Sequence, residues 1–75
     1  MSSRAEAFGR AVRERRLDAG LSQERLGYQS GLDRTYISGV ERGVRNPTLA
    51  AIWKLAEGLN TTPSQLLARS EQLQE

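Results

Sequence analysis

The chain has 75 residues and contains neither cysteine nor histidine. These absences exclude disulfides, thiolate chemistry and the commonest metal ligands and general bases, so we expect no metal, no cofactor and no enzymatic activity. The net charge is only +2, but residues 1–45 carry nine arginines against six acidic residues. Arginine suits bidentate contacts with phosphate and guanine, although a GC-rich genome would give the same bias.

The length allows one domain at most, with a small core that a partner often completes. No apolar run reaches the roughly 18 residues of a membrane span, and the first residues lack the apolar core of a signal peptide. We therefore expect residues 1–75 to form a single soluble, cytoplasmic domain, with no membrane partner and no small-molecule ligand.

Five helices are predicted in chain order, and no segment has a strand pattern. The first runs from about Ser3 to Ala19 and ends at Gly20. Phe8, Val12 and Arg16 recur on one of its faces. An arginine in an apolar stripe either extends to water or pairs with an inward acidic residue.

The second and third helices are predicted over about 22–29 and 34–42, with Ser22 and Asp33 as N-caps. Gly31 supplies the positive φ of a tight turn between them. A mid-helix glycine costs about 1 kcal/mol relative to alanine, so Gly27 predicts a close approach of the third helix. Residues 22–43 thus form a predicted helix-turn-helix unit.

The third helix has two opposite faces. Ile37, Val40 and Glu41 fall on the inner one, which predicts a partly buried ion pair between Glu41 and Arg16. Chance placement of the two charges is the alternative. The outer arc consists of Arg34, Thr35, Ser38, Gly39 and Arg42.

Two further helices are expected to dimerise the protein, over about 48–69. Thr48 caps the first of them, and Thr62 to Gln65 match a capping box with proline at the first helical position. Trp53 lies between the apolar stripe and the exposed side of its helix, so a position at the core edge is the alternative to an interface. The predicted dimer patch comprises Leu49, Trp53, Leu66 and Ala68, although Leu66 and Leu67 are also expected to close the core.

Residues 8–67 resemble the phage-repressor-like, or Xre-type, helix-turn-helix family. The resemblance rests on Gln23, Gly27, Gly31, Ile37, Val40 and Glu41 followed by Gly43. It implies an all-α, five-helix, lambda-repressor-like fold whose second and third helices contact DNA, and the Arg16–Glu41 pair is similar to an interhelical ion pair of that family. The stretch LDRTYISGVERGVRNPTL, residues 32–49, more narrowly resembles the controller proteins of restriction–modification systems.

The controller resemblance implies a stand-alone homodimer that autoregulates, with one dimer activating and further occupancy repressing. Other stand-alone Xre-type regulators, phage repressors and antitoxin-type proteins share related strings, so they remain alternatives. RNA polymerase is a further candidate partner. A protein-interaction module is disfavoured because the outer face of the third helix is polar.

The outer face of the third helix and its flanks supply the candidate DNA contacts. Arg34 lies in the first helical turn, where the dipole disfavours a cation, and we expect it to contact guanine; an ordinary solvated arginine is the alternative. Gly39 is predicted to let the helix approach DNA closely. The predicted base contacts are Arg34, Thr35, Ser38 and Arg45, and the predicted phosphate contacts are Ser22, Gln23, Tyr36, Arg42 and Asn46. Phosphate is the alternative partner of Ser38 and Arg45, and the base contact of Arg45 is what the controller resemblance implies. A two-fold dimer would then bind a pseudo-palindromic site on double-stranded DNA.

Overall fold

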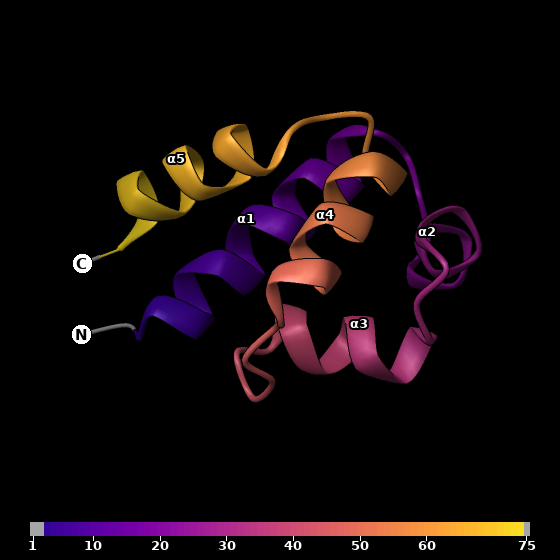
Figure 1. Ribbon diagram of the computed structural model, residues 1–75, viewed down its shortest axis with the longest axis horizontal. Helices are drawn as coiled ribbons and strands as arrows, with labels where there is room; N and C mark the ends of the chain where they lie inside the picture. The colour runs from indigo at the N-terminus through magenta and orange to yellow at the C-terminus, as the bar shows by residue number, and fades with distance from the viewer. Residues whose placement is uncertain (1–2, 75) are drawn as a thin grey trace.

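The computed structural model describes residues 3–74, and within that range the chain forms helices and no strand. The helices are α1 (Arg4–Asp18), α2 (Gln23–Ser30), α3 (Arg34–Glu41), α4 (Leu49–Gly58) and α5 (Pro63–Leu73) (Figure 1). The predicted all-α, five-helix fold is therefore confirmed. Residues 1, 2 and 75, which belong to the predicted domain, lie outside the described residues.

Every helix begins at a hydroxyl or carboxylate side chain that accepts a hydrogen bond from a backbone N–H of the first turn. The caps predicted at Ser22, Asp33 and Thr48 are confirmed. The capping box predicted for α5 is only half formed, because Thr62 accepts from the Gln65 N–H while the Gln65 side chain accepts from the Thr61 hydroxyl. A complete capping box instead begins α1, at Ser3 and Glu6.

The core lies where all five helices meet. Its largest side chains come from every element: Phe8, Val12, Leu26, Ile37, Val40, Leu55, Leu59 and Leu66. Figure 1 shows α1 and α5 side by side, and α1 also packs against α3 while α2 packs against α4. One side of α3 therefore faces the core, and the opposite side is left at the edge of the molecule.

A buried ion pair joins the first and third helices. The Arg16 Nε donates to Glu41 Oε2 at 2.7 Å, and its Nη2 donates to Oε1 at 3.0 Å. Arg16 also donates to the Leu21 carbonyl at 2.8 Å, and the Gln23 amide donates to Glu41 Oε1 at 3.1 Å. The hydrogen bond to Glu41 raises the pKa of Arg16 above its ordinary value, so the guanidinium stays charged. The predicted pairing is confirmed.

A second, half-exposed pair fixes α5 on α1. Arg69 donates to both carboxylate oxygens of Glu14, at 2.7 and 2.8 Å. This contact lowers the pKa of Glu14 below its usual range. Solvent screens such a pair, so it contributes far less to stability than its geometry suggests.

Breaking the buried pair from one side should be costly. We expect Glu41→Gln to lower the free energy of unfolding by about 3–5 kcal/mol, because Arg16 would stay buried without an anionic partner. Urea unfolding at fixed protein concentration measures this loss. Glu14→Gln is the matched control and should shift the urea midpoint far less. Equal losses of unfolding free energy in the two variants would show that the buried Arg16–Glu41 pair matters no more for stability than the exposed Arg69–Glu14 pair.

Candidate nucleic-acid interface

The turn between α2 and α3 depends on two glycines. Gly31 has φ +73°, and its N–H and that of Leu32 both donate to the Gly27 carbonyl, at 2.9 and 3.1 Å. A Cβ on Gly27 would lie 2.7 Å from the Leu32 carbonyl oxygen. A close approach at Gly27 is confirmed, but its partner differs from the prediction. The backbone of the turn comes closest, whereas the nearest atoms of the third helix, Arg34 N and Ile37 Cδ1, would lie 3.6 Å from that Cβ. These contacts fix the angle at which α3 leaves α2.

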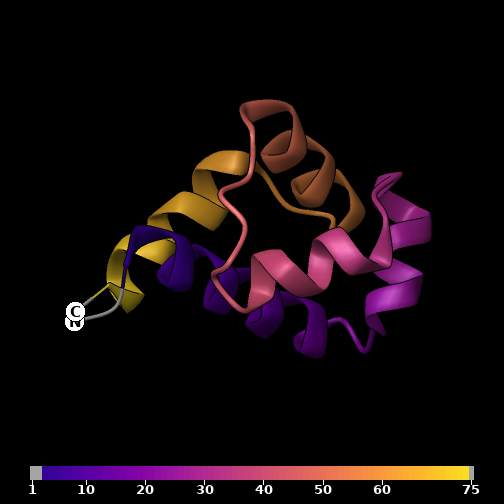
Figure 2. The ribbon, with the colours of Figure 1, turned by 90° about the horizontal axis from the view of Figure 1, so that it is seen from below.

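The outer side of α3 faces solvent at its first turn. Figure 2 views the molecule from the side on which α3 lies. Ile37 and Val40 anchor the helix in the core, while Arg34 and Thr35 are exposed and Ser38 is half-buried. The Asp33 carboxylate accepts from the Thr35 N–H at 3.2 Å, which fixes the first turn. The predicted base-contacting side chains of α3 thus share one accessible face.

The structure contradicts the position predicted for Gly39. Gly39 is buried, and a Cβ there would lie 2.6 Å from Cγ of Arg45. The loop after α3 folds back over this position, so Gly39 is covered by protein and does not form part of the exposed face. Helical periodicity places Gly39 on the outer arc, but it carries no information about the path of the following loop.

The loop brings further polar side chains to the end of α3. Arg42, Arg45 and Asn46 are exposed, and the Arg42 Nε donates to the Ser38 carbonyl at 3.3 Å. The guanidinium of Arg45 lies 5.8 Å from the centre of the half-buried Tyr36 ring. The face of α3 and the loop therefore form one continuous polar surface with three arginines, Arg34, Arg42 and Arg45.

The start of α2 differs in part from its prediction. The Ser22 hydroxyl is exposed and accepts from the Arg25 N–H at 3.0 Å, as expected of a cap. Gln23 is half-buried, and its side-chain amide is bonded to Glu41. Gln23 therefore belongs to the buried ion-pair network, a role that the sequence pattern did not reveal. Phosphate contacts at Ser22 and Gln23 stay predictions that rest on the free N–H groups of the first turn.

A second surface, on α4 and α5, exposes large apolar side chains. Leu49 is 68% exposed and Trp53 52%, and Ala68 is also at the surface. Leu66 is 3% exposed because it packs into the core of its own chain. The prediction that it closes the core is confirmed, and its place in the predicted dimer patch is wrong. Leu67 is also expected to close the core, but it is 43% exposed. We call Leu49, Trp53, Leu67 and Ala68 the α4–α5 patch.

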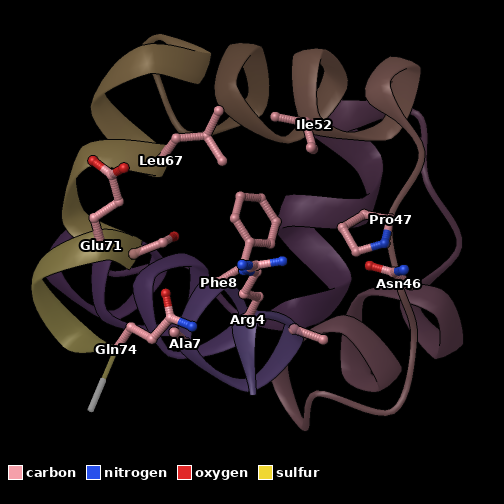
Figure 3. Close-up of a pocket in the computed structure, with 11 residues that line it drawn as sticks. Arg4, Ala7, Phe8, Asn46, Pro47, Ile52, Leu67, Glu71 and Gln74 are labelled. Carbon is pink, nitrogen blue, oxygen red and sulfur yellow. The ribbon is translucent and has the colours of Figure 1, made fainter. Parts of the chain in front are cut away.

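An open cleft of about 360 Å³ borders this patch. Figure 3 shows Phe8 near its centre, with Leu67 and Ile52 above it and Pro47 and Asn46 to its right. Leu67 lines the cleft and also belongs to the α4–α5 patch, so the two apolar features are continuous.

None of the helices within residues 3–74 has the length and apolarity needed to cross a membrane. In the same range, no three histidine, cysteine or acidic residues come together in a cluster that would hold a metal ion.

Comparisons with known proteins identify the family of this chain. A family model described as helix-turn-helix matches residues 12–66. The chain is 46% identical over 61 residues to control protein C.BamHI of Bacillus amyloliquefaciens, covering 80% of this chain and 75% of that protein. It is 48% identical over 64 residues to control protein C.SmaI of Serratia marcescens, covering 85% and 76%.

The chain belongs to the helix-turn-helix family of restriction–modification controller proteins. Solved controller proteins have the same fold. C.AhdI from Aeromonas hydrophila matches with a TM-score of 0.81 and 52% identity, over 83% of this chain and 94% of that one. C.Esp1396I, solved as a tetramer with its natural 35-base-pair operator, matches with a TM-score of 0.87 and 33% identity, over 97% and 96%.

The close packing of the turn at Gly27 can be tested by mutation. We expect Gly27→Ala to destabilise the fold by about 1–3 kcal/mol, because the new methyl group would collide with backbone that cannot move freely. Alanine is otherwise the better helix former, so a purely local effect would have the opposite sign. Thermal unfolding of the variant measures the change. Increased stability would show that the turn leaves room for a methyl group at position 27.

Proposed function

We propose that this chain is a sequence-specific transcription regulator that binds double-stranded DNA as a homodimer and controls restriction–modification genes, its own included. The observation that carries the proposal is the accessible face of α3. Arg34 and Thr35 are exposed on this face, while Ile37 and Val40 anchor the same helix in the core. The kinship with control proteins and the operator complex of C.Esp1396I support it. Its site of action is the cytoplasm, and no enzymatic activity is part of the proposal.

The arrangement suits insertion of α3 into the major groove. A recognition helix contacts base edges mainly through its N-terminal residues, and Arg34 and Thr35 occupy the first turn of α3. A guanidinium forms bidentate bonds with guanine O6 and N7, and the threonine methyl suits the thymine methyl. We assign Ser38 and Arg45 to further base contacts, and Ser22, Gln23, Tyr36, Arg42 and Asn46 to the flanking phosphates.

Selection of bound duplexes from a random pool at about 150 mM salt, with sequencing of the bound fraction, tests the proposal. We expect an inverted repeat. On the selected duplex, Arg34→Ala should lose about 1–3 kcal/mol and relax one base-pair position per half-site. Arg42→Ala should instead weaken binding to all duplexes alike and reduce the dependence of affinity on salt.

Two results would count against this assignment. Folded wild-type protein that enriches no sequence would leave only non-specific attraction and would favour a protein-interaction role. An equal loss on selected and random duplexes for Arg34→Ala would remove its role in base recognition.

The α4–α5 patch is the surface we assign to the homodimer. Large exposed apolar side chains on neighbouring helices commonly mark protein contacts, and a tryptophan contributes a large apolar area to such a contact. The patch lies on α4 and α5, whereas the candidate DNA surface lies on α3 and the loop after it, so one chain can use both at once. A two-fold pair would present two α3 helices to half-sites about one helical turn apart.

Sedimentation tests the dimer separately from DNA binding. At micromolar concentration the wild type should sediment with a mass near twice 8.3 kDa. Trp53→Asp should shift the protein to the monomer, because a carboxylate would be buried at the contact without a partner. Lys54→Asp, an exposed neighbour on the same helix, is the control and should stay dimeric. A wild type that is monomeric both alone and on DNA would exclude the assigned interface and the palindrome.

A further inference from the structure

Arg45 occupies the space that any side chain at position 39 would need. A Cβ on Gly39 would lie 2.6 Å from Cγ of Arg45, and 3.6 and 3.7 Å from its Cβ and Cδ. The aliphatic part of the arginine therefore lies directly on the α3 backbone. Since Gly39 is buried and Arg45 is exposed, the arginine covers the glycine and still presents its charged end to solvent.

The backbone of Arg45 is held at the same place. Gly43, with φ +77°, turns the chain after α3, and the N–H groups of Val44 and Arg45 then donate to the Gly39 carbonyl at 3.0 and 3.2 Å. The guanidinium lies over the Tyr36 ring, 5.8 Å from its centre. Backbone, aliphatic part and charged end of Arg45 are thus each in contact with α3.

We propose that Gly39 and Tyr36 are positioning residues that hold Arg45 beside α3 as a second base-contacting arginine. The proposal rests on the proposed function and adds to it the reason why a loop side chain can discriminate between bases. A free loop arginine loses rotamer freedom when it binds, whereas one already held against the helix loses less. Glycine is the residue that leaves room for this packing, because any Cβ displaces the arginine.

Arg42 provides the contrast within the same surface. It is also exposed and follows α3 directly, but its side chain is held by a hydrogen bond to the Ser38 carbonyl and does not cover a glycine. We therefore expect substitution of Arg42 to lower affinity without altering base preference, while disturbance of the position of Arg45 alters base preference.

The free protein gives the first test, which needs no DNA. Nuclear Overhauser effects should connect the Gly39 Hα protons with the Cγ protons of Arg45 in the wild type. Their absence from a well-resolved spectrum would overturn the proposal and leave the proposed function intact. A wild type that shows these effects but selects no DNA sequence would overturn the proposed function and the base-contacting role together, and leave only the packing.

The second test measures base preference on the selected duplex and its single-base-pair variants. Arg45→Ala should lose about 5- to 150-fold in affinity and relax one base-pair position. Gly39→Ala should relax the same position, and the double variant should bind no more weakly than Arg45→Ala. Base preference is a ratio between duplexes, so a reduced fraction of folded protein does not change it. Arg42→Ala is the control that should keep the preference.

Tyr36 gives an independent measurement should Gly39→Ala fail to fold. Tyr36→Phe keeps the ring beneath the guanidinium and should keep the preference at that position, whereas Tyr36→Leu should relax it. The proposal is overturned if Gly39→Ala folds and keeps the wild-type preference, if the losses of Gly39→Ala and Arg45→Ala simply add, or if Tyr36→Leu and Tyr36→Phe have the same preference.

Discussion

The buried ion pair between Arg16 and Glu41 sets the position from which α3 can act. A helix of eight residues has little stability of its own, so its orientation must come from contacts with the rest of the chain. Ile37 and Val40 supply the apolar contacts, but apolar packing tolerates small shifts. The bidentate hydrogen bonds from Arg16 to Glu41 do not tolerate such shifts. Gln23 extends this network to the start of α2. Because desolvating two charges is costly, the contribution of this pair is best understood as fixing geometry.

Local signals made the elements predictable from the sequence. The caps at Ser22, Asp33 and Thr48 satisfy N–H groups three residues away or fewer, so the chain itself specifies them. The Arg16–Glu41 pair was predictable too, because two opposite charges on inward faces have few other ways to be satisfied. Periodicity alone could not decide which of Leu66 and Leu67 is buried, or that Gly39 is covered. A helical pattern tells which residues share a face, but which leucine a neighbouring helix covers, and where a loop returns, depend on tertiary packing.

Two glycines of the helix-turn-helix unit illustrate the difference. Gly27 is next to backbone, the Leu32 carbonyl, and this contact belongs to the turn that defines the motif. Gly39 is next to a side chain, Arg45, whose loop follows the motif. The contact at Gly27 is part of the fold, and Leu32 is only five residues away in the sequence. The contact at Gly39 shapes the exposed surface, and Arg45 is recognisable as its partner only once the path of the loop is known. The two helical glycines are thus needed for different physical reasons, Gly27 to leave room for backbone and Gly39 to leave room for a side chain.

Base contacts and dimerisation must supply the discrimination between DNA sequences. Attraction to phosphate is the same for every sequence, so it adds affinity without preference. Each good bidentate contact discriminates by about 1–3 kcal/mol. Against about 10⁶ competing genomic sites, a regulator needs about 8 kcal/mol of preference. The few base contacts proposed for one short α3 would barely reach that value. In the proposed dimer, two copies joined through α4 and α5 would double the number of base contacts. The same requirement would account for a candidate DNA surface and an exposed apolar patch on one chain.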